Sequence, residues 1–265
     1  MAGNDSKILA AAVSSGGVIT WPVALAIGAH FGLSQATVQR VLQRLVVANA
    51  LHRTTIVGER MDAWLTTPTT AAAFGRPAGT RFLGRGNSGD TWSPGPTLRH
   101  DQLALLATFQ FASAAAAVDD DDDPTAAPEA EIEQQFTTTA GQHIPDGAFI
   151  FRGGKCVGVE VELSKKSGGP AGKNTTAWSR SLAPTILDRQ AGAGTRILAL
   201  ERTIDATLLV APRRIARPIG AAVRREAEER DCPPGLVFWC EPRRPLQLGR
   251  MQIWQLENEE PPEED

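Results

Sequence analysis

Two short stretches decide the fold of the second half of the chain: Ile144-Pro145-Asp146-Gly147 and Val159-Glu160-Val161-Glu162-Leu163-Ser164-Lys165-Lys166. The first sets a carboxylate directly before an apolar strand. The second belongs to a strand in which alternation puts Glu160 and Glu162 on one face and the valines on the other. Three carboxylates and a lysine at one end of a hairpin are the groups that hold a divalent metal against a phosphodiester.

The loop of this hairpin decides whether Asp146 can meet Glu160. The expected strands are 148–151 and 156–163, joined by a turn at Gly153-Gly154. A strict two-residue turn would set Asp146 opposite Val161, on the wrong face. A three-residue loop, 152–154, would set it opposite Glu160, and a bulge at 145–147 would serve equally. We expect one of these two. The alternative for the whole stretch is an edge hairpin with a solvated acidic face.

The N-terminal residues 6–70 predict a compact helical module. A first helix begins at Ile8, a second at Trp21 and a third covers 35–48, for which Ser34 is a favourable N-cap. On the third helix an apolar stripe lies opposite a polar face that carries Arg and Gln side chains. Two short strands, 51–57 and 61–67, follow it.

This order of elements resembles the winged helix-turn-helix domains of bacterial regulators and plasmid proteins. The resemblance implies binding to double-stranded DNA, with the third helix in the major groove and the strands as the wing. The expected DNA contacts are Ser34, Gln35, Thr37, Gln39, Arg40, Gln43, Arg44, His52 and Arg53. The alternative is an ordinary three-helix packing or dimerisation unit, and paired half-sites would suit a homodimer.

Pro145-Asp146 and Glu160-Val161-Glu162 resemble the motif of the PD-(D/E)XK nuclease superfamily. The resemblance implies a central mixed sheet flanked by helices, Mg²⁺ as cofactor, and Asp146, Glu160 and the backbone carbonyl of Val161 as metal ligands. The implied catalytic residues are Asp146, Glu160, Glu162 and Lys166. The superfamily usually has lysine where this chain has Glu162, although some restriction enzymes place glutamate there. His143 could serve as a general base, but we expect a hydrogen-bonded surface histidine.

A wider resemblance joins both modules. A winged helix, a helix starting near His100, the two acidic stretches and the later segment 207–219 resemble the replication-relaxation family of actinobacterial and plasmid proteins. That family implies a role in plasmid replication or mobilisation, with replication or mobilisation proteins as partners. The chain departs from it in the helix after the acidic strand, where Trp178, Arg180 and Arg189 stand instead of the expected spaced Arg and Tyr.

Charge divides the chain into alternating segments. Residues 1–100 and 141–250 are basic, whereas 101–140 contain no Lys or Arg and the last fifteen residues are acidic. Basic modules favour polyanion partners, although solvated surface charge is the plainer explanation. We find no membrane-spanning run or signal peptide, so a cytoplasmic protein is expected. The three cysteines have no metal-ligand spacing and are expected to be reduced.

The expected fold is therefore α+β. It comprises a winged helix-turn-helix domain over 1–70, a Gly/Pro-rich linker over 71–99, a restriction-endonuclease-like mixed sheet flanked by helices over 100–256, and an acidic disordered tail over 257–265. Within the third segment we also expect a strand near 130–138 and a helix over 176–189.

Overall fold

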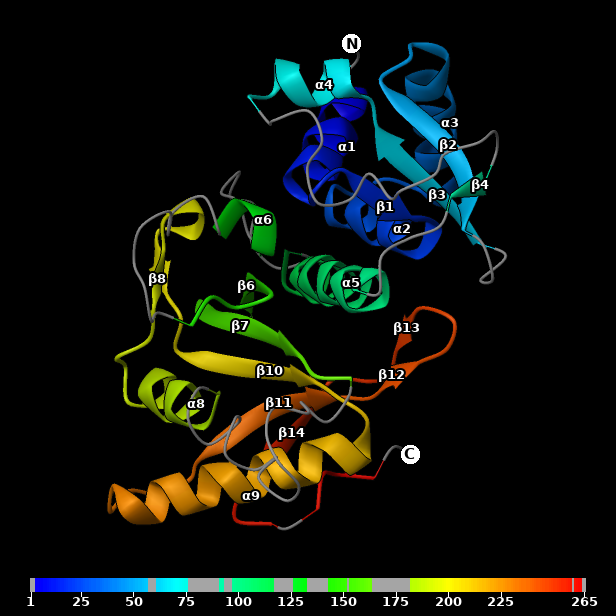
Figure 1. Cartoon of the computed structure of the whole chain (residues 1–265). Helices are drawn as coiled ribbons and strands as arrows, with labels where there is room; N and C mark the ends of the chain where they lie inside the picture. The colour runs from blue at the N-terminus through cyan, green and yellow to red at the C-terminus, as the bar shows by residue number, and fades with distance from the viewer. Residues whose placement is uncertain are drawn as a thin grey trace. The chain divides into compact units, whose positions relative to one another are not determined.

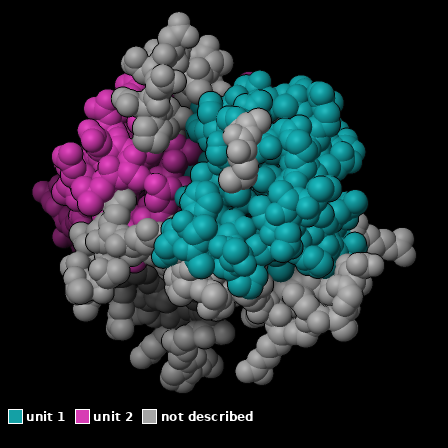
Figure 2. Space-filling model, turned by 90° about the horizontal axis from the view of Figure 1, so that it is seen from above, with its two compact units in different colours: residues 1–119 teal, residues 120–265 magenta. Residues whose placement is uncertain are grey.

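The computed structural model describes residues 3–56, 61–75, 91–92, 97–116, 126–132, 143–151, 153–163, 182–258 and 260–263. The chain forms two compact units, residues 1–119 and 120–265 (Figures 1 and 2). Each unit combines helices with a sheet, which confirms the expected α+β class. No described helix is long and apolar enough to cross a membrane.

The first unit pairs a helical cluster with a small sheet in the strand order β1-β3-β2-β4. Strand β3 pairs antiparallel with β1 and β2, and β2 pairs parallel with β4. Its elements are α1 Gly3–Ser14, β1 Val18–Thr20, α2 Trp21–His30, α3 Gln35–Val47, β2 Leu51–Ile56, β3 Met61–Thr66, α4 Pro68–Ala73, β4 Thr91–Trp92 and α5 Leu98–Ala116.

Helix α5 belongs to this first unit, so the unit extends past the boundary at residues 99–100 that the sequence suggested. The helix packs along α2. Its buried Gln102 accepts a hydrogen bond from the Thr20 backbone N–H at 2.8 Å and donates one to the Val18 carbonyl at 3.0 Å. These bonds satisfy backbone groups of β1 that would otherwise be buried without partners.

The second unit is built on a six-stranded mixed sheet in the order β14-β11-β10-β7-β6-β5. Strand β10 is parallel to both β7 and β11, and the outer pairings are antiparallel. Its elements are β5 Ala126–Pro128, α6 Glu129–Ile132, β6 Gly147–Phe151, β7 Lys155–Val161, α8 Leu182–Gln190, β8 Arg196–Ile197, the 3₁₀ helix η2 Leu198–Leu200, β9 Arg202–Thr203, β10 Ala206–Val210, α9 Arg213–Glu229, β11 Leu236–Cys240, β12 Pro242–Arg243, β13 Gln247–Leu248 and β14 Gln252–Gln255.

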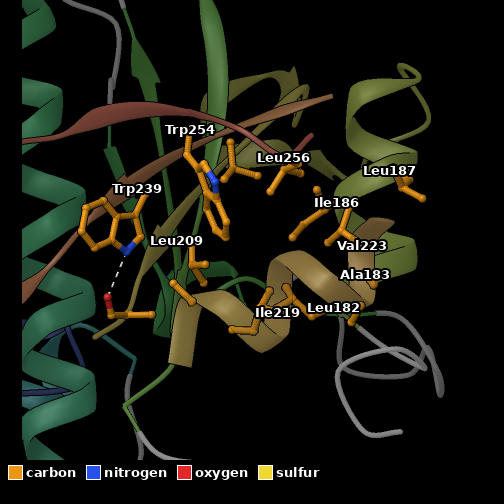
Figure 3. Packing of buried hydrophobic residues seen from close by; sticks show 14 of the residues in the cluster. Leu182, Ala183, Ile186, Leu187, Leu209, Ile219, Val223, Trp239, Trp254 and Leu256 are labelled. Atoms are coloured by element: carbon orange, nitrogen blue, oxygen red, sulfur yellow. Dashed lines mark hydrogen bonds between the residues drawn. The ribbon is translucent and has the colours of Figure 1, made fainter. Parts of the chain in front are cut away.

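Helices α8 and α9 cover one face of this sheet and enclose its main core (Figures 1 and 3). Two buried tryptophans dominate the core, and each indole N–H has an acceptor: Trp239 donates to the Ala211 carbonyl at 3.0 Å and Trp254 to the Asn258 carbonyl at 3.3 Å. Gly220 lets α9 approach closely, because a Cβ at this position would lie 2.5 Å from the Trp254 ring.

Two sequence expectations in this unit differ from the structure. Residues 130–132 lie in the short helix α6 rather than in a strand, and 133–138 lie outside the described residues. The acidic tail was expected to be disordered, yet its described residues, 257–258 and 260–263, lie beside α9, with Pro261 buried. Arginine side chains of α9 supply several of the contacts that hold it there, and Gln252 and Trp254 of β14 donate to the carbonyls of Glu263 and Asn258.

Candidate functional site

The outward face of α3 is the first candidate surface. Ser34 caps the helix, since its hydroxyl accepts a hydrogen bond from the Thr37 backbone N–H at 3.3 Å. Val38, Val41, Leu42 and Leu45 are buried as the periodicity predicted. The polar side chains opposite this stripe are exposed: Ser34, Gln35, Gln39, Arg40, Gln43 and Arg44. Thr37 is half-buried, with its hydroxyl 3.0 Å from that of Ser34.

Two of the expected DNA contacts have ionic partners inside the unit. Arg44 forms a two-pronged pair with the buried Asp5 of α1, with Nε 3.2 Å from Oδ2. The hydrogen bond from Arg44 holds the pKa of Asp5 below its ordinary value. Arg53 on β2 pairs with Asp62 on β3 at 2.8 Å, whereas His52 is exposed on β2. Arg44 therefore ties α3 to α1 as well as facing solvent.

The hairpin of β6 and β7 is the second candidate site, and its register decides which carboxylates meet. Phe151 pairs with Lys155 and Gly147 with Val159, so the loop has the three residues 152–154. This register confirms the expected alternative to a two-residue turn. It continues through the hydrogen bond from the Asp146 backbone N–H to the Val159 carbonyl, 2.9 Å, which sets Asp146 opposite Glu160.

Asp146 closes the open end of the hairpin. Its Oδ2 accepts a hydrogen bond from the Val161 backbone N–H at 2.7 Å. Asp146 thus bonds to both ends of the short segment that carries Glu160: its backbone N–H donates to the Val159 carbonyl, and its carboxylate accepts from the Val161 N–H. Beside this contact the chain remains paired with β10, because the Glu162 N–H bonds to the Val210 carbonyl at 2.9 Å.

Glu160 lies in a buried polar cluster that joins three elements. Arg189 of α8 donates from Nη2 to Glu160 Oε1 at 2.7 Å and from Nη1 to the Thr207 hydroxyl of β10 at 3.0 Å. His143 Nε2 lies 2.8 Å from Glu160 Oε2. Arg189 and Glu160 are almost fully buried, whereas 27% of the His143 side chain is exposed. His143 is hydrogen-bonded as expected, but to this carboxylate.

Gly158 makes room for the buried guanidinium. A Cβ on Gly158 would lie 2.9 Å from both Cζ and Nη1 of Arg189, closer than real Cβ contacts come. Because Gly158 and Glu160 alternate to the same face of β7, the strand offers a gap and then a carboxylate to one arginine. A glycine between the valines of this strand was the sequence signal for this close approach.

The charges of this cluster support one another. Burial alone would raise the pKa of Glu160, but the positive charge of Arg189 and the hydrogen bond from His143 outweigh it and lower that pKa. Burial likewise favours neutral His143, yet its hydrogen bond and attraction to Glu160 leave the pKa of His143 raised. The carboxylate is therefore ionised and neutralised by side chains of the protein itself.

These residues do not fit the implied Mg²⁺ in the conformation seen. Both oxygens of Glu160 have nitrogen partners, and Oδ2 of Asp146 accepts a backbone N–H. Across the described residues there is no group of three or more His, Cys, Asp or Glu side chains placed to hold a metal. Glu162, two residues after Glu160, is buried. Lys166, which was expected to be catalytic, lies outside the described residues.

Sequence reasoning missed the partners of Glu160. Arg189 was noted only as a departure from a family pattern, and Thr207 only as the start of the segment 207–219. Sequence patterns predict contacts between neighbouring strands and between successive turns of a helix. Arg189 is 29 residues from Glu160 along the chain, so these patterns do not pair the two residues. No family model, curated protein or solved structure matches the chain.

Proposed function

We propose that the chain is a duplex-DNA-binding protein whose first unit is a winged helix-turn-helix domain. The order α1-β1-α2-α3-β2-β3, with β3 between β1 and β2, supports this assignment. In such domains the helix before the hairpin enters the major groove and the hairpin follows the backbone.

One observation carries the proposal: α3 is buried on one side by a strict apolar stripe and exposes Gln39, Arg40 and Gln43 on the other. Arginine and glutamine can make paired hydrogen bonds to guanine and adenine edges. The guanidinium of Arg40 bonds within the fold only to the Ala36 carbonyl of its own helix, through Nε at 3.2 Å, among the contacts of the described residues. Its remaining donors are available to a base or phosphate.

For the second unit we propose a nuclease-like fold that serves as a scaffold for dimerisation or for a partner protein. The mixed sheet and the pairing of Asp146 with Glu160 support the likeness to PD-(D/E)XK nucleases. The contacts of Glu160 with Arg189 and His143 support the structural role. With the replication-relaxation resemblance, the proposal extends to plasmid or mobile-element replication or mobilisation, with replication or mobilisation proteins as partners.

A metal-dependent DNA endonuclease or nickase is the second candidate function. The register of β6 and β7 favours it, because Asp146 and Glu160 are brought opposite each other. The same residues would have to exchange their present partners before they could bind Mg²⁺. We therefore derive no catalytic step from them.

One experiment separates the two functions. Supercoiled and linear plasmid DNA are incubated with the protein in Mg²⁺, Mn²⁺ or EDTA and run on native gels that report both a shift and cleavage. We expect a shift in all three conditions and no nicking. Because each paired base contact is worth about 1–3 kcal/mol, Arg40→Ala with Gln43→Ala should weaken the shift on the preferred sequence by about tenfold or more.

Matched controls make the result specific. Arg202→Ala removes an exposed arginine of the second unit and should leave the shift unchanged. Asp146→Asn removes one implied metal ligand while keeping an oxygen acceptor for the Val161 N–H, and it leaves the buried pair of Glu160 and Arg189 intact. Metal-dependent nicking that disappears in this variant would establish the endonuclease instead. A shift insensitive to the α3 changes would contradict the winged-helix assignment.

A further inference from the structure

Helix α9 carries a row of arginines along one side. Arg213, Arg217 and Arg224 lie within about 40° of one another around the helix, because their spacings of four and eleven residues are close to whole turns. The buried residues of α9, such as Ile215, Ala222 and Val223, lie on the side that packs on the sheet. The row spans about 16 Å at 1.5 Å rise per residue.

The acidic C-terminal segment lies along this row. Arg224 donates from Nη1 to the carbonyls of Leu256, 3.0 Å, and Asn258, 3.2 Å. Arg217 forms an ion pair with Glu260, and Arg213 donates to the Pro261 carbonyl. Each arginine of the row thus bonds to an oxygen of the segment, and the order of contacts is antiparallel to the helix.

The ion pair in the middle of the row is of a kind that a competing anion can replace, whereas Arg213 and Arg224 bond to backbone carbonyls. The Arg217 and Glu260 side chains are about half exposed, 56% and 49%, and exposed ion pairs contribute little net stability. Arg214 and Arg225 are also exposed on α9, next to the row. A straight line of guanidinium groups suits the regularly spaced phosphates of a nucleic acid, since arginine binds phosphate through paired hydrogen bonds.

We propose that the arginine row of α9 is a second DNA-binding surface, which takes the phosphate backbone of duplex DNA, and that the acidic tail occupies it in the free protein. This goes beyond the proposed role of α3, because it concerns another unit and a contact that carries no base sequence. The tail acts as an internal competitor: DNA gains the row only by displacing the Glu-rich segment.

The test neutralises the tail without shortening the chain. In the full-length protein, Glu257, Glu259, Glu260, Glu263 and Glu264 are each changed to Gln, and binding to a short duplex of arbitrary sequence is followed by fluorescence anisotropy over a range of NaCl. We expect the neutralised variant to bind about tenfold more tightly, and its plot of log affinity against log salt to steepen by about two. Far-UV circular dichroism verifies that the fold is retained.

A second pair of changes locates the gain. Added to the neutralised tail, Arg217→Gln with Arg224→Gln should abolish the gain, whereas Arg196→Gln with Arg202→Gln, an equal charge loss at exposed positions of β8 and β9, should keep it. An affinity unchanged by tail neutralisation, or a gain that survives the α9 changes, would overturn the proposal. So would a gain seen with single-stranded RNA and absent with duplex DNA.

The result is independent of the first unit. The tail-dependent gain should persist when Arg40→Ala and Gln43→Ala are also present, because the row contacts phosphates alone. If the winged-helix proposal is wrong, the changes on α3 will leave the affinity for DNA unchanged. If the present proposal is wrong, neutralising the tail will leave the affinity for DNA unchanged.

Discussion

Glu160 stays ionised inside the second unit because Arg189 and His143 both bond to it. Removing one member of a buried ion pair typically costs about 3–5 kcal/mol, since the remaining charge is left in a poor solvent. The cluster ties β7, α8 and β10 together at one point through Glu160, Arg189 and Thr207. A residue chosen from the sequence as a metal ligand is thus committed to holding the fold.

The raised pKa of His143 makes the stability of the second unit depend on pH. Protonated His143 contributes fully to the free energy of unfolding when the pH is below the pKa of this residue in the unfolded chain, about 6.5. This contribution is lost as the pH rises through the higher pKa of His143 in the folded protein. We expect the free energy of unfolding to fall by about 1 kcal/mol over that rise, relative to His143→Gln. Urea unfolding of both proteins between pH 5.5 and 9 would measure it.

The difference between the two proteins isolates His143 from other titrating groups. His30, for example, has a pKa lowered by burial and acts in the opposite direction. His143→Gln keeps an amide donor for Glu160 but cannot gain a proton. Parallel stability curves for the two proteins would show that the charge of His143 contributes nothing.

At the residue scale, the sequence predicted what depends on local order and missed what depends on distant contact. Asp146 and Glu160 could be matched because a loop length sets the register of a hairpin. Arg189 could not be assigned to Glu160, because the helix that carries it reaches the strand only through packing. Gly158 indicated that another group packs closely against β7, but the sequence did not show that this group is the Arg189 side chain.

Among the elements, helices with strong periodicity were predicted well. The helix over 35–48 with its Ser34 cap corresponds to α3, and the two strands that follow it correspond to β2 and β3. The strand expected near 130–138 was wrong over 130–132, where alanine and glutamate, which have good helix propensity, help to form α6. The tail was also misjudged, because its acidic composition says nothing of the arginines folded beside it.

The packing of α9 on the sheet leads to a prediction about Gly220. In Gly220→Ala the new methyl group would meet the Trp254 ring at 2.5 Å. The overpacking costs about 1–3 kcal/mol, which exceeds the gain in helix propensity of about 1 kcal/mol. We expect a lower urea midpoint in unfolding followed by tryptophan fluorescence.

The control for this prediction is the same change in a Trp254→Phe background. Phenylalanine is shorter than tryptophan, so the added methyl group has space and the cost of Gly220→Ala should shrink or reverse. Equal costs in the two backgrounds would mean that the contact with Trp254 is not the reason.

For the whole molecule, the division at residues 119 and 120 has a consequence that the sequence did not suggest. Helix α5 packs along α2 and supplies Gln102 to the buried backbone of β1. A Gly/Pro-rich stretch at 71–99 gave the impression of a linker between domains, yet the chain returns through it to complete the first unit. A Gly/Pro-rich composition predicts irregular backbone. It does not predict whether the domain ends before or after that segment.

We therefore predict that residues 1–119 form a stable fragment and residues 1–96 do not. The shorter fragment loses the buried side chains of α5, including Leu103 and Leu106, each worth about 1.5–3 kcal/mol when fully buried. It also leaves the buried N–H of Thr20 without its acceptor, at a cost of about 1–3 kcal/mol. Circular dichroism on heating should show a cooperative melt for 1–119 and a much lower or absent transition for 1–96. Within 1–119, Gln102→Leu separates the polar part, since it keeps an apolar side chain there and removes both hydrogen bonds. Gln102→Leu should lower the melting temperature of 1–119 by less than the truncation to 1–96 does. If the fragments 1–119 and 1–96 melt at the same temperature, α5 is not part of the folding unit.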